Sequence, residues 1–235
     1  MLSKVLRTLA GIVLLPMAYA VGEAFYTSIS SISVLSGTFR ILERGVLAYL
    51  LIHIFIFRPV YVYVLGHEAV HALATWLCGG RVISFNVTPS GGGVVTSKTN
   101  FFIELSPYFV PIYTVMLCPL SLGMHMAGKS GPGVSAVFLF LVGFTMAFHF
   151  VLTNEALRLQ QPDLMKSGFI FSLVVIFVAN IVVIEAIFTP FFESVSLRGF
   201  LSDAAANTGD VYTLIYGKIL EIMDNIKTWY QGAGF

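Results

Sequence analysis

Long apolar runs, separated only by short polar breaks, constrain the fold of this chain more than any other feature of the sequence. Of the 235 residues, 57% are hydrophobic and 11% are charged, whereas a soluble domain carries about 25% charged residues. Runs of this composition predict an all-α polytopic membrane protein, a bundle of about six transmembrane helices. The expected spans cover residues 9–26, 39–57, 60–78, 101–126, 134–152 and 167–188, and Pro107, Pro111 and Pro119 break up the span at 101–126.

The chain divides into three regions by composition. Residues 1–38 hold an N-terminal membrane helix, or a signal-like segment, and a connection; we favour an uncleaved helix because its apolar run continues past Ala18-Tyr19-Ala20. Residues 39–190 form the membrane core. Residues 191–235 form a C-terminal amphipathic tail, which either lies in the membrane interface or docks on the bundle.

Charge and cysteine content exclude several classes of protein. The formal net charge of +1 gives no basis for a nucleic-acid partner. The two cysteines show no C-x-x-C spacing, so neither a disulfide framework nor a thiolate metal site is indicated. We expect an integral, multi-pass membrane protein in contact with the lipid bilayer. The first location that we expect for it is a bacterial cell membrane. The oligomeric state does not follow from the sequence.

The run 60–78 carries an H-E-x-x-H pattern at its centre, formed by His67, Glu68 and His71. On a helix, residues four apart share a face, so the two histidines can bind one zinc ion. Glu68 can then take a proton from water at the metal without being a ligand. Chance occurrence of the pattern is the alternative, but burying three such side chains in an apolar helix is costly without a purpose.

A catalytic zinc site needs a third protein ligand. Asp163 is favoured, because it follows Pro162 at the expected start of a helix and would complete a set of two histidines and one carboxylate. A charge that stabilises the helix N-terminus is the alternative interpretation of Asp163. The other candidate ligands are His149, Glu155, Glu104 and His125.

Asn154, nine residues before Asp163, is a candidate for substrate binding. Its side chain can donate to a scissile carbonyl or to a ligand, although a cap or turn residue is an alternative interpretation.

The sequence pattern changes from helical to strand-like after Gly79-Gly80. Residues 81–88 are rich in β-branched side chains with rough alternation, residues 89–93 read as a turn, and residues 94–97 read as a second short strand. We therefore predict a β-hairpin directly after the H-E-x-x-H helix. Its open edge offers backbone groups with which an extended peptide can pair; a plain connecting hairpin is the alternative.

The sequence resembles the site-2 protease family of intramembrane zinc metallopeptidases in four features. These are the Gly-His-Glu-x-x-His-Ala helix, the Gly79-Gly80 pair that ends it, the Gly-rich hairpin and the later Pro162-Asp163. The resemblance is to a minimal branch without PDZ or CBS domain, and it makes residues 39–190 an intramembrane metallopeptidase core. It implies one Zn²⁺ per chain held by His67, His71 and Asp163, with Glu68 catalytic and Asn154 near the substrate. It implies hydrolysis of a peptide bond in or near a transmembrane segment of a membrane-protein substrate.

Two other functions remain open at this stage. A catalytically silent membrane protein of the same fold would bind membrane partners without cleaving them. A metal transporter would use a relay of scattered polar residues, namely His53, His125, His149 and Glu185.

Overall fold

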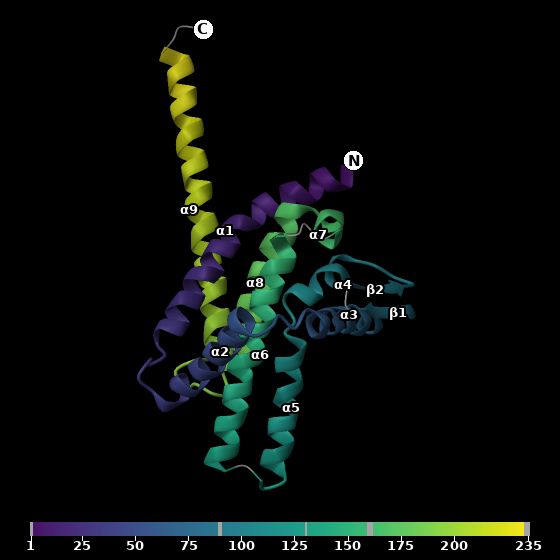
Figure 1. The fold of residues 1–235 in the computed structure, drawn as a ribbon. Coiled ribbons are helices and arrows are strands. Elements are labelled where there is room, and N and C mark those ends of the chain that lie inside the picture. Colours follow the sequence, from purple (N-terminus) through teal and green to yellow (C-terminus); the bar gives the residue numbers. More distant parts are fainter. Residues whose placement is uncertain (1, 89–90, 130, 159–161, 233–235) are drawn as a thin grey trace.

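The computed structural model describes residues 2–88, 91–129, 131–158 and 162–232 of the chain (Figure 1). In chain order its elements are α1 (Leu2–Ser30), α2 (Gly37–Phe55), α3 (Val60–Leu77), β1 (Val82–Thr88), β2 (Gly91–Thr96), α4 (Phe101–Leu105), the 3₁₀ turn η1 (Ser106–Tyr108), α5 (Ile112–Met126), α6 (Pro132–Arg158), α7 (Pro162–Ser167), α8 (Phe169–Phe188) and α9 (Leu197–Gly232). The predicted helical class and the predicted hairpin after the H-E-x-x-H helix are both confirmed.

Local signals in the sequence set several of the boundaries. The side chain of Ser36 accepts a hydrogen bond of 3.1 Å from the Phe39 amide and so caps α2. α3 begins directly after Pro59 and ends at Leu77, and Gly79 follows its C-cap with a φ of 72°, which suits glycine. The Asn100 side chain caps α4 by accepting from the Ile103 amide at 2.8 Å.

A close helix crossing joins α2 to α6. A Cβ atom on Gly45 would lie 2.0 Å from the carbonyl oxygen of Phe140, and one on Gly143 would lie 2.2 Å from that of Leu42. Glycines at a crossing let two helix backbones touch, as small residues do in membrane proteins. Around this crossing, a buried apolar cluster joins α2, α6, the end of α8 and the chain after it, made of Leu42, Leu139, Val142, Met146, Ile187, Phe192 and Val195.

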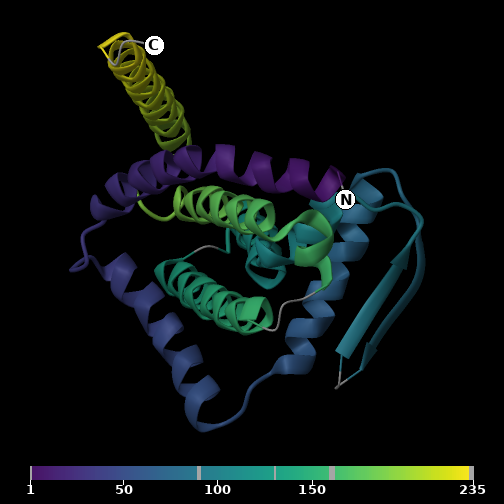
Figure 2. The ribbon, with the colours of Figure 1, turned by 90° about the horizontal axis from the view of Figure 1, so that it is seen from above.

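Viewed from above, α1, α2 and α3 surround α6 and α8 on three sides (Figure 2). The hairpin lies on the outer side of α3, away from α6. The two views agree that α3 lies across the direction of α5, α6 and α8 (Figures 1 and 2). The H-E-x-x-H helix is therefore held crosswise to the longest apolar helices.

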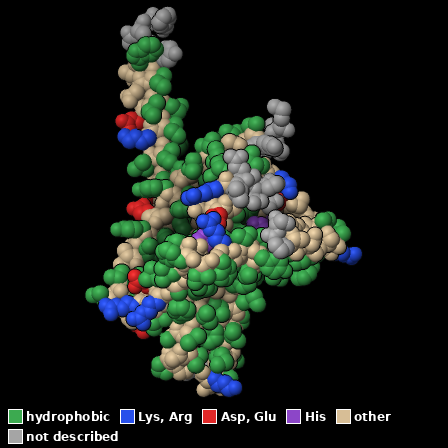
Figure 3. Space-filling view, in the orientation of Figure 1, with side chains coloured by type: hydrophobic (Ala, Val, Ile, Leu, Met, Phe, Trp, Pro, Cys, Tyr) green, Lys and Arg blue, Asp and Glu red, His purple; other side chains and the backbone are tan. Residues whose placement is uncertain are grey.

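Three helices are long and apolar enough to cross a membrane, namely α1 from Val5, α6 and α8. A fourth span results if Phe101–Tyr108 and Ile112–Met124, which meet at a bend of 78°, are one broken span. The described chain thus offers three or four spans, fewer than the six expected. The first half of α2 carries Arg40, Glu43 and Arg44, and α3 carries the H-E-x-x-H side chains. Neither helix is therefore apolar enough to count as a membrane span. Hydrophobic side chains nonetheless cover much of the face over α5 and α6 (Figure 3).

The span expected over residues 101–126 is interrupted at two of its three prolines. Pro107 and Pro111 divide this stretch into α4, η1 and α5, because each proline removes a backbone donor and clashes with the preceding turn. Pro119 is accommodated inside α5. The predicted turn at residues 89–93 is also too long, since Gly91 to Gly93 belong to β2, where they pair with Thr88, Val87 and Asn86.

The tail forms one helix, α9, of 36 residues. Its first half docks on the bundle: Phe200 and Ala204 are buried in a cluster with Val21, Ala24 and Ile181. The Tyr212 hydroxyl also donates a hydrogen bond to the Val13 carbonyl of α1. Of the two placements expected for the tail, docking on the bundle therefore holds for the first half of α9. The second half extends beyond the bundle (Figure 1).

We expect Gly45→Ala to lower the stability of the protein by about 1–3 kcal/mol or more, because the added methyl group meets the α6 backbone. Gly123→Ala in α5 is the matched control, since nothing lies within 4 Å of a Cβ there, and it should be neutral or stabilising by up to about 1 kcal/mol. Thermal unfolding in detergent measures both. Equal melting temperatures for the two variants would contradict the tight crossing.

Candidate metal centre

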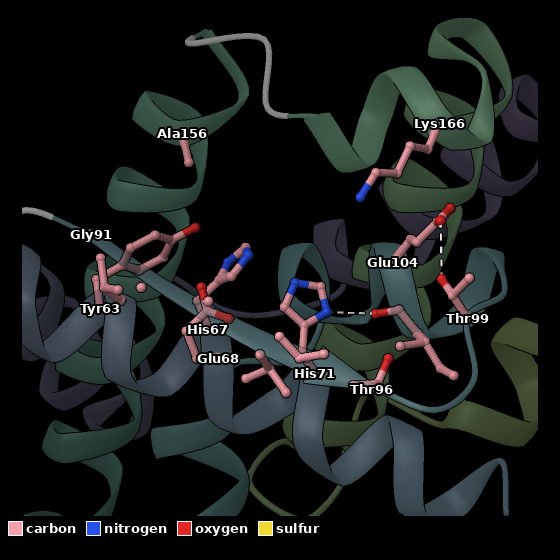
Figure 4. A pocket seen from close by; sticks show the side chains of 16 residues that line it. Tyr63, His67, Glu68, His71, Gly91, Thr96, Thr99, Glu104, Ala156 and Lys166 are labelled. Atoms are coloured by element: carbon pink, nitrogen blue, oxygen red, sulfur yellow. Dashed lines mark hydrogen bonds between the residues drawn. The ribbon is translucent and has the colours of Figure 1, made fainter. Parts of the chain in front are cut away.

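A cavity of about 770 Å³ lies beside α3 (Figure 4). Its size is typical of a ligand-binding site. The lining residues come from α3, β2, α4 and its approach, the end of α6, and α7: Tyr63, Val64, His67, Glu68, His71, Gly91, Gly92, Gly93, Val94, Val95, Thr96, Thr99, Ile103, Glu104, Ala156 and Lys166. All three side chains of the H-E-x-x-H pattern therefore face one cavity.

The two histidines lie together on one face of α3, as their spacing predicts. Their ring centroids are 4.9 Å apart, and the ring planes are inclined by 78°. Two imidazoles bound through nitrogen to one tetrahedral zinc ion, at about 2.0–2.1 Å, have centroids roughly 5 Å apart. The pair thus fits a shared metal ion without rearrangement of the helix.

A backbone carbonyl fixes the orientation of His71. Its Nδ1 lies 2.7 Å from the carbonyl oxygen of Ile103 in α4. A carbonyl only accepts, so Nδ1 carries the proton and the lone pair is left on Nε2. Metal-binding histidines are commonly held by such a hydrogen bond from the other ring nitrogen, which orients the ring and raises its basicity.

Aromatic rings hold His67 from two sides. The centroid of the Tyr63 ring lies 5.8 Å from that of His67, and the Tyr108 ring makes an edge contact at 5.1 Å. Tyr63 is itself anchored, because its hydroxyl donates to Thr153 Oγ1 of α6 at 3.2 Å. These contacts tie α3 to η1 and α6 at the level of the site.

Glu68 is buried, with 8% of its surface exposed, yet it lines the cavity. β2 crosses it closely at Gly92: a Cβ atom there would lie 2.8 Å from both Glu68 Cγ and Val64 Cγ1. Only a residue without a side chain lets the strand pass so near the carboxylate stem. The Gly-rich stretch, predicted as a turn, therefore serves to bring a strand against Glu68.

α4 and α7 form the opposite wall of the cavity (Figure 4). Glu104 accepts hydrogen bonds from Thr99 Oγ1, at 3.1 Å, and from Ser167 Oγ. The Lys166 side chain extends toward the cavity, and its carbonyl accepts from Arg7 Nη1 of α1 at 2.7 Å. Because Ser167 and Lys166 belong to α7, these bonds fix that short helix against α4 and α1.

The third metal ligand stays a prediction. Asp163 is the second residue of α7, three before Lys166, but its side chain lies outside the described part of the chain. Among the described side chains, no group of three histidines, cysteines or carboxylates is close enough to hold a metal. His149 is buried behind His67, where both line a small void of about 10 Å³, and it does not join the His67–His71 pair in such a group.

The other candidates lie elsewhere. Glu155 pairs with His53 at 3.3 Å and with Arg58 at 3.5 Å, outside the cavity. The side chain of His125 is outside the described residues. Glu185 is buried at the far end of α8, where it accepts from Ser28 Oγ at 3.1 Å. The residues considered for a transport relay are thus not brought together in the described structure.

Asn154, the predicted substrate-binding residue, is exposed on α6. It is not among the residues that line the cavity, whereas its neighbour Ala156 is. Sequence reasoning missed Ile103, Tyr108, Gly92 and Lys166. A carbonyl acceptor leaves no mark in the residue type, so of these only Gly92, in a run of three glycines, carried a visible signal.

Comparison with protein-family models, with curated proteins and with solved structures finds no match for this chain in any of the three.

We expect the purified full-length protein to bind about one zinc ion per chain, as a two-histidine, one-carboxylate site does. Asp163→Ala should lose most of this zinc, whereas His149→Phe, which changes the buried histidine behind His67, should keep it. Metal content after equilibration with zinc measures both. Retention in Asp163→Ala together with loss in His149→Phe would assign the third ligand to His149 instead.

Proposed function

We propose that this protein is an intramembrane zinc metallopeptidase of the site-2 protease type, which hydrolyses a peptide bond in or near a transmembrane segment of another protein. The observation that carries the proposal is the cavity shared by His67, Glu68 and His71, in which a carbonyl of α4 fixes the His71 ring. A chance H-E-x-x-H pattern would not require its histidines to be paired, oriented and open to one cavity.

His67 and His71 hold the metal in this proposal, and Asp163 of α7 is the third ligand. The ring separation of 4.9 Å and the proton on Nδ1 of His71 both support the histidine pair. Support for Asp163 is indirect: α7 is anchored to α4 and α1 through Ser167 and Lys166, on the wall opposite α3. A zinc ion bound there would supply Lewis acidity, which lowers the pKa of water to about 7 and polarises a scissile carbonyl.

Glu68 acts as the general base. Its neighbours favour this role, because Val64 and the Gly92 backbone pack on its stem and limit where the carboxylate can lie. It takes a proton from the attacking water and delivers it to the leaving amine nitrogen. A base that must act in both directions gains from such a fixed position, since a small displacement lengthens both proton transfers.

The substrate binds as an extended segment along β2. An intact helix hides its carbonyls, so the target segment must unwind before the bond can be attacked. β2 pairs on one side with β1, in an antiparallel register from Thr88–Gly91 to Val82–Thr96, and its residues line the cavity. A strand in this position can pair with an extended peptide through its backbone and present a carbonyl to the site.

We expect Glu68→Gln to keep zinc yet to lose peptidase activity by about 10²-fold or more, since a general base contributes about 10²–10⁴-fold. A suitable assay follows cleavage of co-expressed single-span reporter proteins whose spans contain Gly and Pro, which ease unwinding. Glu155→Gln is the matched control, because that carboxylate pairs with His53 and Arg58 outside the cavity. Cleavage that survives Glu68→Gln would exclude this mechanism.

A second outcome of that assay bears on the alternative function. If the wild-type protein binds zinc but cleaves none of the reporters, while it captures one of them in a stable complex, the catalytically silent binding protein is the better description.

Gly92→Ala should reduce cleavage by about 10- to 100-fold with little loss of zinc, because the methyl group displaces Glu68 or the strand. Gly93→Ala is the matched control on the next residue of β2, where nothing lies within 4 Å of a Cβ. Rates for the two variants are compared at equal zinc occupancy. Equal rates would show that the approach of β2 to Glu68 has no part in catalysis.

A further inference from the structure

The second half of α9, residues 213–232, is here called the projecting segment. It extends beyond the bundle (Figure 1), and no side chain that is described from Thr213 to Trp229 is buried. Three of its four isoleucines are exposed: Ile219, Ile222 and Ile226 expose 50%, 56% and 51% of their area. A helix that carries such a row of large apolar side chains in water is expected to have a partner.

The spacing of these residues indicates what kind of partner. Tyr212, Ile215, Ile219, Ile222, Ile226 and Trp229 follow one another at steps of three, four, three, four and three. Steps that alternate between three and four give a mean period of 3.5 residues, which keeps the apolar row facing a second helix along its length. A helix that docks alone on a globular core does not need its apolar residues to follow this spacing so regularly. The row from Tyr212 to Trp229 is here called the seam.

The charge of the projecting segment distinguishes a second helix from a membrane surface as its partner. The only charged residues of the projecting segment are Lys218, Glu221, Asp224 and Lys227, so it is electrically neutral. Lys218 is also paired with Glu221 at 2.7 Å. Helices that lie on anionic bilayers carry an excess of Lys and Arg on the polar face, which this segment lacks.

The seam also continues an interface that the chain already forms. Tyr212, its first member, donates its hydroxyl hydrogen to the Val13 carbonyl of α1. α1 and α9 diverge after they cross (Figure 1), and the upper part of α9 runs on with no described helix beside it.

We propose that the projecting segment joins copies of this chain through a parallel coiled coil, with the isoleucines at its core. Copies in one membrane share one orientation, so their projecting segments leave the bundle on the same side and run parallel. Isoleucine at both core positions of the heptad, as with Ile219 and Ile222, favours three or four strands over two. The membrane also concentrates the copies, which assists a seam of this modest length. The proposal does not rest on the peptidase activity.

Cysteine cross-linking of the full-length protein in lipid vesicles tests this seam. In a background of Cys78→Ala and Cys118→Ala, which removes both native thiols, single cysteines replace Ile222, in the seam, or Asp224, on the opposite side of the helix. A mild oxidant should link most Ile222→Cys chains to another copy, and at least tenfold fewer Asp224→Cys chains. Equal linkage at both positions, or none at Ile222→Cys, would overturn the proposal.

A second comparison separates self-association from other occupants of the same face. The double change Ile219→Lys and Ile226→Lys places charges in the seam and should abolish the cross-link of Ile222→Cys. The helix content should stay unchanged, because neither isoleucine is buried in the single chain. Persistence of the cross-link would overturn the proposal. So would an uncross-linked Ile222→Cys that vesicles shield from a water-soluble maleimide, since that result would place the segment on lipid.

Discussion

The close crossing of α2 and α6, at Gly45 and Gly143, determines how the rest of the molecule is arranged. With no side chain on either residue, the two backbones touch at this crossing. α2 continues through a short connection into α3, which carries the histidine pair, and α6 leads toward α7. The crossing therefore sets the distance between the two walls of the candidate metal centre. The hydrogen bond from Tyr63 to Thr153, at 3.2 Å, fixes the same spacing near the cavity itself.

The polar side chains of α3 impose a second constraint. Two histidines and a glutamate in an apolar helix need polar partners or access to water, because burial without either is costly. The break at Pro107 supplies one partner, since a proline has no amide hydrogen to donate to the Ile103 carbonyl, which accepts from His71 instead of continuing a long helix. Irregular backbone is tolerated beside a membrane where it is covered by protein or lines a cavity. The interruption of the span and the orientation of the histidine thus have one cause.

The charged and polar groups outside the cavity have structural partners of their own. His53 lies between Tyr49, at 3.0 Å, and Glu155, at 3.3 Å, and so ties α2 to the end of α6. Glu104 holds α7 through Ser167. The chemistry of the proposed reaction is therefore concentrated in one cavity, whereas these pairs keep its walls in place. The projecting segment of α9 stands apart from both, because it extends beyond the bundle and none of its described side chains is buried.

The sequence by itself determined the helical class, the H-E-x-x-H helix with both histidines on one face, and the hairpin after it, because periodicity and glycine or proline signals act over a few residues. It also named Glu68 as the candidate base. The tertiary structure decided the number of spans, the docking of half of α9 and the surroundings of His71, since each depends on atoms distant in the chain. Gly92 shows the difference: the sequence marked it only as part of a predicted turn, and the reason for a glycine there is the stem of Glu68, 24 residues earlier.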